Sequence, residues 1–120
     1  MEGHVSWVIE LAVKDGQIDT FRDLMEEMVA GTSTEPGTLG YEWYSSDDGG
    51  TVHIYEKYAD SDAMIAHVSG FMQNWAGRFL ACVDVTRFVT YGDPSPAARE
   101  LLDGFGATYL AAWGGFSRFA

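Results

Sequence analysis

Apolar positions along the chain follow two spacings, one of two residues and one of three to four. Residues 5–13 alternate between two faces, which predicts a strand that ends at Lys14-Asp15-Gly16. Residues 17–31 then carry an apolar stripe opposite an acidic face, which predicts a helix released by Gly31. The stripe consists of Ile18, Phe21, Leu24, Met25, Met28 and Val29.

Two more strands follow a turn at Pro36-Gly37. Residues 39–45 and 52–58 have strand character, and Asp47-Asp48-Gly49-Gly50 between them has the acidic residues and glycines of a hairpin loop. Residues 84–91 alternate again and predict a fourth strand, with Val85, Arg87, Val89 and Tyr91 on one face.

Helical segments fill the interval before that fourth strand. Asp60-Ser61-Asp62 can cap a short helix over residues 63–68. We expect Gly70 to interrupt it and a further helix to run over residues 71–80. The order strand, helix, strand, strand, helix, strand predicts an α+β fold of the ferredoxin-like kind.

The end of the chain differs in character. Ser95 and Pro96 predict the start of a helix that continues over residues 97–103, and residues 107–113 form an apolar, strand-like segment. We expect one domain over residues 1–120, with a core over about 4–92 and a C-terminal extension over about 93–120.

The predicted sheet has large apolar groups on both faces. The helices can cover only one face of the sheet, so the apolar groups on the opposite face need another partner. The simplest partner is the same sheet face of a second copy of the chain. The pattern therefore predicts a homodimer. We expect the tail from Ala107 to Ala120 to dock on the partner subunit, the alternative being that it folds back on its own subunit.

Composition narrows the classes of function. The net charge of −11 argues against nucleic acid and anionic membranes as partners, and no apolar run approaches the roughly 20 residues of a membrane span. We therefore expect a cytoplasmic protein. An aromatic share of 14% exceeds the needs of one small core and indicates a ligand pocket or a subunit interface. The single cysteine, Cys82, lies in an apolar run and is expected to be buried.

Two stretches of the sequence form a recognisable combination: the Glu35-Pro36-Gly37 turn that leads into Tyr41, and the stretch from Tyr55-Glu56-Lys57-Tyr58-Ala59-Asp60 to His67. Together these motifs resemble the antibiotic biosynthesis monooxygenase family, which has a dimeric α/β barrel fold. The resemblance covers about residues 4–92. The later runs, from Thr86 to Ser95 and from Gly114 to Arg118, resemble a subgroup with a C-terminal extension.

The resemblance implies a homodimer with a pocket between sheet and helices in each subunit. Some members oxidise polycyclic phenols or quinols with molecular oxygen, without metal or flavin, so no cofactor is expected. Other members degrade haem with an Asn, a Trp and a His in set places. The first strand here has no Asn, and His67 stands about where that Trp would be.

His67 and Glu56 are the candidate catalytic residues. His67 follows an apolar helical turn, and a neutral imidazole there could accept a phenol proton. Glu56 could orient it. For His67, the alternative is a structural histidine that is hydrogen-bonded to Glu56 or to backbone. For Glu56, the alternative is an ion pair with Arg87 or Lys57.

Candidate substrate-binding residues are aromatic. Trp75, Phe71 and Phe79 lie at helical spacing and could stack on a planar substrate, or form ordinary core. Tyr55 is a further candidate substrate-binding residue. His4 and His53 lack ligand spacing, so no metal site is expected.

Two functions of different classes remain open. One is a cofactor-independent monooxygenase acting on a small aromatic, phenolic or quinol substrate. The other is a non-catalytic homodimeric module that binds a small ligand or a partner.

Overall fold

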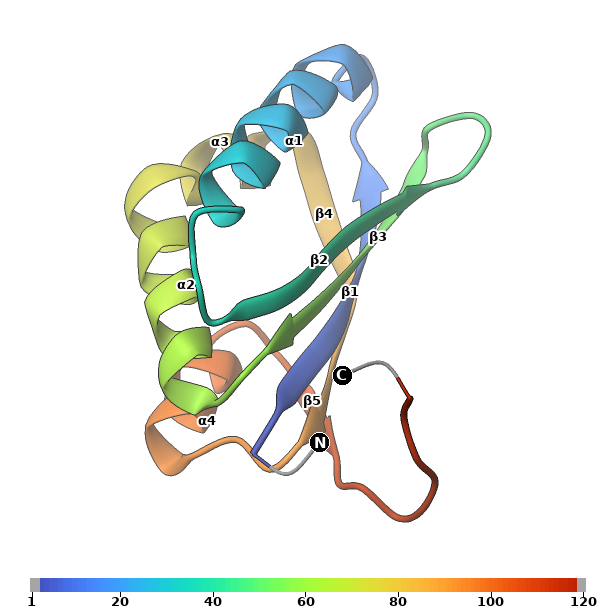
Figure 1. The fold of residues 1–120 in the computed structure, drawn as a ribbon. Coiled ribbons are helices and arrows are strands. Elements are labelled where there is room, and N and C mark those ends of the chain that lie inside the picture. Colours follow the sequence, from blue (N-terminus) through green and yellow to red (C-terminus); the bar gives the residue numbers. More distant parts are fainter. Residues whose placement is uncertain (1–2, 119–120) are drawn as a thin grey trace.

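Five strands form one sheet in the order β2-β3-β1-β4-β5 in the computed structural model, which describes residues 3–118 (Figure 1). All neighbours are antiparallel except β4 and β5, which are parallel. The strands are β1 (Val5–Val13), β2 (Thr38–Ser45), β3 (Thr51–Tyr58), β4 (Val83–Gly92) and β5 (Thr108–Leu110). The predicted α+β, ferredoxin-like fold is confirmed.

Four helices pack on one side of this sheet and leave its other face without a helical layer (Figure 1). They are α1 (Ile18–Thr32), α2 (Ser61–Asn74), α3 (Ala76–Cys82) and α4 (Pro96–Asp103). The buried positions of α1 are Phe21, Leu24, Met28 and Thr32, which follow the helical spacing of its apolar stripe.

The break between the two middle helices was predicted at the wrong residue. Gly70 lies inside α2, and the helix ends at Trp75, whose backbone leaves the helical region at φ −130°. A glycine costs only about 1 kcal/mol inside a helix, which the packing of Met64 and Val68 against the sheet can offset. Trp75 is held by burial and by its own hydrogen bond from Nε1 to Glu27, 2.8 Å long.

The predicted alternation of β4 was wrong at one end. Val85 pairs with Leu11 and Arg87 pairs with Glu10, so Thr86 is an extra residue in a β-bulge, and its hydroxyl donates to the Glu10 carbonyl. A bulge shifts the side chains that follow it by one position. Val85 therefore faces the helices, while Arg87 lies on the far face.

The tail is divided between two environments. Residues 108–110 pair with β4 of the same subunit, which agrees with the alternative that the tail folds back on its own subunit. The strand is shorter than the predicted 107–113. After β5 the chain leaves the sheet as a C-terminal arm, residues 111–118 (Figure 1). Trp113 is fully exposed in this arm, and Phe116 is 80% exposed.

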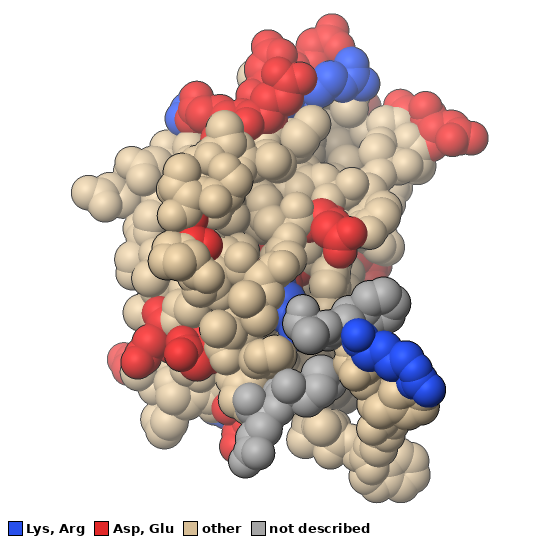
Figure 2. Space-filling view, viewed as in Figure 1, with Lys and Arg blue, Asp and Glu red and all other residues tan. Residues whose placement is uncertain are grey.

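Two apolar clusters fill the space between sheet and helices. One joins α1 and α3 to the sheet, and the other joins α2 and α4 to Trp7, Tyr58 and Phe88. Acidic side chains gather over the start of α1 and the β2–β3 loop, at the top of the view, and leave much of the remaining surface in that view uncharged (Figure 2). Cys82 is buried, as expected.

Candidate functional site

Helix α2 carries His67 to the sheet because its inward positions recur at helical spacing. Met64, His67 and Val68 are buried, and Phe71 follows one turn later. The helix starts at Asp60, whose side chain accepts a hydrogen bond from the Ala63 backbone at 2.8 Å. This cap fixes where the helix begins and thus which residues face inward.

Three strands place a row of large side chains beneath that helix. Glu56 of β3 pairs with Tyr41 of β2 on one side and with Trp7 of β1 on the other. Directly paired residues of neighbouring strands point to the same face, with Cβ atoms about 5 Å apart. Tyr41, Glu56 and Trp7 therefore form a cross-strand row under His67.

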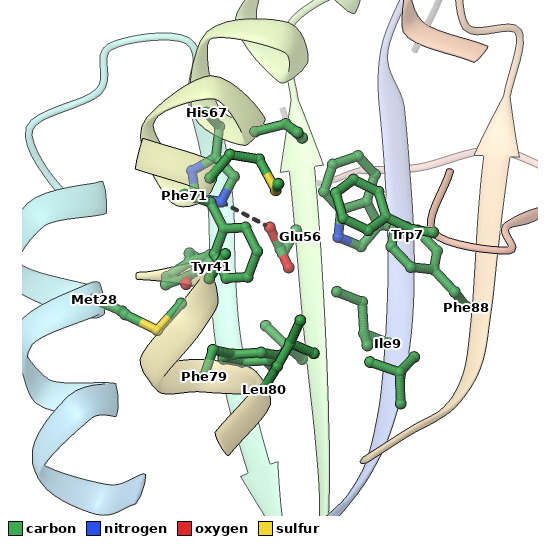
Figure 3. A pocket seen from close by; sticks show the side chains of 16 residues that line it. Trp7, Ile9, Met28, Tyr41, Glu56, His67, Phe71, Phe79, Leu80 and Phe88 are labelled. Carbon is green, nitrogen blue, oxygen red and sulfur yellow. Dashed lines mark ion pairs between the residues drawn. The ribbon is translucent and has the colours of Figure 1, made fainter. Parts of the chain in front are cut away.

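A chain of polar contacts links this row to the helix and to a turn. Both nitrogens of His67 contact carboxylates. Nδ1 lies 2.8 Å from Glu35 Oε1. Nε2 lies 3.2 Å from Glu56 Oε1, the contact that is dashed in Figure 3. The Tyr58 hydroxyl donates to the same Glu56 oxygen. His67 and Glu56 are 4% and 3% exposed, so water screens these contacts weakly.

The environment of His67 favours its charged form. Burial would lower the pKa of the imidazole, but the contacts with Glu56 and Glu35 and their negative charges outweigh burial and raise it above 6.5. The contacts with the two carboxylates therefore favour the imidazolium form of His67.

Two tyrosines in the same region resist ionisation. Burial and the negative charge of Glu56 raise the pKa of Tyr41 well above 10.0. Burial, together with the charge and the hydrogen bond of Glu56, also raises the pKa of Tyr58 well above 10.0. Both phenols therefore stay neutral, and Tyr58 acts as a donor to Glu56.

A pocket of about 130 Å³ opens beside this polar chain. Its inner end contains Trp7, Tyr41, Glu56 and His67, and the rest of its wall is apolar (Figure 3). Its lining includes three exposed side chains from α2, α3 and β4, namely Met72, Leu80 and Val85, which mark its mouth. The pocket suits an apolar ligand that has one polar group at its inner end.

Four of the expected site residues lie together in this pocket: Glu56, His67, Phe71 and Phe79. Trp75 is not among the lining residues, since its indole packs against Gly31 and donates to Glu27. Tyr55 neighbours Glu56 in a strand and so points to the far face of the sheet. The expected stacking wall is therefore formed by other residues.

The alternatives weighed for the two catalytic candidates have different outcomes. Glu56 forms no ion pair with Arg87, which lies 3.5 Å from Glu10 on the far face. His67 does contact Glu56, and this contact is expected both for a structural histidine and for a catalytic one.

Sequence reasoning missed several residues of the site. Glu35 was assigned only to a turn, and neither Trp7 of β1 nor Phe105 of the C-terminal extension was among the candidate residues. The strand spacing assigns Trp7 to the same face as Ile9 and Leu11, but nothing in it distinguishes a pocket wall from core. Phe105 stacks on Phe88, with ring centroids 6.2 Å apart.

The polar groups of the site do not converge as metal ligands would. Glu35 and Glu56 contact opposite nitrogens of one imidazole, and residues 3–118 contain no cluster of three or more His, Cys, Asp or Glu side chains arranged to hold a metal ion. In the same residues, no helix is long and apolar enough to cross a membrane.

Fold and site together define a small α+β protein with an apolar pocket closed by an acidic inner end. The sequence model of the antibiotic biosynthesis monooxygenase family matches residues 5–74, more than half of the chain. The chain belongs to this family, as the motifs around Tyr41 and His67 predicted. The match contains Trp7, Glu35, Glu56 and His67.

Solved structures share the fold at low sequence identity. MupZ from Pseudomonas fluorescens has a TM-score of 0.79 and 17% identity, over 96% of this chain and 94% of that one. SnoaB, a cofactor-independent oxygenase from Streptomyces nogalater, has a TM-score of 0.65 and 17% identity, over 78% and 95%. Rv0793 from Mycobacterium tuberculosis has a TM-score of 0.64 and 21% identity, over 78% and 98%. The search of curated proteins returned no match.

Proposed function

We propose that this protein is a cofactor-independent monooxygenase that oxidises a small phenol or quinol in the pocket between the sheet and α2. The observation that carries the proposal is a buried carboxylate, Glu56, at the inner end of an otherwise apolar pocket. Family membership and the likeness to a cofactor-independent oxygenase support the same reaction class.

Glu56 is the proposed proton acceptor, and His67 its positioning residue. Both ring nitrogens of His67 already face carboxylates, which leaves no basic nitrogen for a substrate. Glu56 uses Oε1 for both Tyr58 and His67, and its other oxygen points away from His67 among the lining side chains (Figure 3). This assignment revises the roles first expected, in which His67 was the base.

The proposed reaction starts with proton transfer from the substrate hydroxyl to Glu56. The resulting phenolate is electron-rich and transfers an electron to molecular oxygen. The two radicals combine at the para carbon to a peroxide anion, which takes the proton back from Glu56 to give a carbon-bound hydroperoxide. Loss of water from that hydroperoxide yields a quinone. One phenol with a para hydrogen and one oxygen molecule thus give one quinone and one water, so no external reductant is needed.

Oxygen uptake over a panel of phenols, naphthols and naphthalenediols that carry a hydrogen para to a hydroxyl tests this proposal. We expect uptake with at least one of them, one isotopically labelled oxygen atom in the quinone, and a loss of about 10²–10⁴-fold in Glu56→Gln. Glu26→Gln, which removes an exposed carboxylate of α1, is the matched control and should match the parent. Absence of uptake over the whole panel would contradict a monooxygenase.

A non-catalytic ligand-binding module is the second candidate. The apolar wall and exposed apolar mouth are sufficient for binding, whatever the inner end does. Saturable binding of a naphthol without oxygen consumption would favour this function.

We also propose a homodimer. The far face of the sheet has no helical cover, and the C-terminal arm exposes Trp113 and Phe116, which is unusual for a solvated segment. A second copy packed on the far face, with each arm lying on its partner, would bury both surfaces.

A further inference from the structure

The inner end of the pocket contains a buried hydrogen-bond donor that has nothing to bond. Among residues 3–118, the indole Nε1 of Trp7 has no hydrogen-bond partner, and the side chain is only 2% exposed. A buried polar group without a partner costs about 1–3 kcal/mol, so it needs an explanation.

The orientation of this indole supplies one. Trp7 lines the pocket, and its nitrogen edge faces Glu56 from the neighbouring strand (Figure 3). Its ring is fixed by Tyr58 and Phe88, whose centroids lie 4.9 Å and 5.3 Å away. The donor is therefore held in place and aimed into the pocket beside the outward oxygen of Glu56.

From this pair we infer that Trp7 and Glu56 together recognise one hydroxyl group on the ligand, with Nε1–H donating to its oxygen and Glu56 accepting its proton. A hydroxyl can accept and donate at once, whereas an ether can only accept and a hydrocarbon does neither. The inference rests on the proposed function, because it specifies how the same pocket binds its substrate.

The pair also favours the ionised ligand. When the hydroxyl proton moves to Glu56, negative charge develops on the oxygen that Trp7 Nε1 contacts. A rigid donor in a pocket with few other polar groups stabilises that charge without reorganising. Trp7 is thus a binding residue whose contact strengthens as the substrate ionises.

The size of the pocket limits what lies beside that hydroxyl. An apolar cavity of about 150 Å³ accommodates benzene, so about 130 Å³ accommodates one ring. Met72, Leu80 and Val85 at the mouth offer apolar contact to whatever extends outward. The hydroxyl that Trp7 and Glu56 recognise therefore lies on the innermost ring of the proposed phenolic substrate.

Anaerobic binding of three matched ligands tests the inference separately from catalysis. The ligands are 1-naphthol, 1-methoxynaphthalene and 1-methylnaphthalene, and the readout is the indole N–H resonance of Trp7 in a ¹H–¹⁵N spectrum. We expect a downfield shift with 1-naphthol, absent with 1-methylnaphthalene, and about tenfold tighter binding of 1-naphthol than of the methoxy compound.

Trp7→Phe should lose about tenfold in affinity for 1-naphthol and retain its affinity for 1-methylnaphthalene, while Trp113→Phe in the exposed arm should change neither. Equal shifts with all three ligands, or no binding of 1-naphthol, would overturn the inference. If 1-naphthol binds as described but no oxygen is consumed, the monooxygenase fails and the recognition stands. If oxygen is consumed and Trp7→Phe binds 1-naphthol like the parent, the recognition fails alone.

Discussion

One buried carboxylate, Glu56, and one half-buried carboxylate, Glu35, contact the two nitrogens of His67 and favour its charged form. This arrangement governs the behaviour of single residues in the site. The sequence could indicate His67 and Glu56, because both are polar residues in apolar surroundings. It could not indicate their roles, since the second carboxylate, Glu35, lies 32 positions before His67 and meets it only in the fold.

The charge of His67 has a consequence for stability. Its pKa is raised on folding, so the folded state holds its proton more tightly than the unfolded state does. The stabilisation is complete below about pH 6.5 and is lost as pH rises through the raised pKa. We expect His67→Gln to lower the free energy of unfolding by about 3 kcal/mol at pH 6 and by less at pH 9. Urea unfolding at both pH values measures this, and an equal loss at both would contradict a charged His67.

Tyr58 makes the stability of the protein depend on pH in the alkaline range as well. Its raised pKa keeps the folded phenol neutral, so its contribution is present below pH 10.0 and is lost above it, where the unfolded state ionises. Tyr58→Phe removes a hydrogen bond to a carboxylate, which should cost about 2 kcal/mol at pH 8.

The difference between Tyr58→Phe and the parent should narrow by pH 11, again measured by urea unfolding. Tyr91→Phe makes the same chemical change on an exposed part of β4 and should unfold like the parent at pH 8. A gap for Tyr58→Phe that widens toward pH 11 would be inconsistent with the neutral, buried phenol.

At the scale of elements, the turn before β2 determines whether Glu35 reaches His67. Gly37 lies so close to α2 that an added Cβ would stand 2.5 Å from the Cβ of Ala63, and Ala59 donates to its carbonyl. The Glu35-Pro36-Gly37 motif was identified from the sequence as a turn, but the contact that requires its glycine is a tertiary one.

Gly37→Ala should therefore destabilise the protein by about 1–3 kcal/mol and separate Glu35 from His67. Ala63→Gly removes the opposing methyl group, and we expect the double variant to recover most of the loss apart from the cost of a helical glycine. Thermal unfolding of the four proteins gives the coupling. Additive losses would show that contact with α2 is not the reason for the glycine.

Elements were predictable from spacing wherever one face of a helix or strand is buried. The exceptions have identifiable causes: the Thr86 bulge reverses the alternation of β4, and packing keeps Gly70 inside α2. Such competing tertiary contacts are invisible to a local pattern.

At the scale of the whole molecule, the C-terminal arm links the fold to the proposed homodimer. Truncation after Leu110 removes Trp113 and Phe116 but leaves β5 and its pairing with β4 intact. We expect the dimer to dissociate at least tenfold more readily, since each buried aromatic contributes roughly 1.5–3 kcal/mol. Sedimentation across protein concentrations measures this, and an unchanged dissociation constant would exclude the arm from the interface.

Glu56 is proposed to accept the substrate proton, whereas His67 is proposed only to hold Glu56 in position. Oxygen-uptake kinetics of Glu56→Gln and His67→Gln, on the phenol or naphthol that the parent oxidises best, test this claim most directly. We expect kcat/KM to fall by about 10²–10⁴-fold in Glu56→Gln and by a clearly smaller factor in His67→Gln. Loss of activity in His67→Gln with activity retained in Glu56→Gln would contradict the claim.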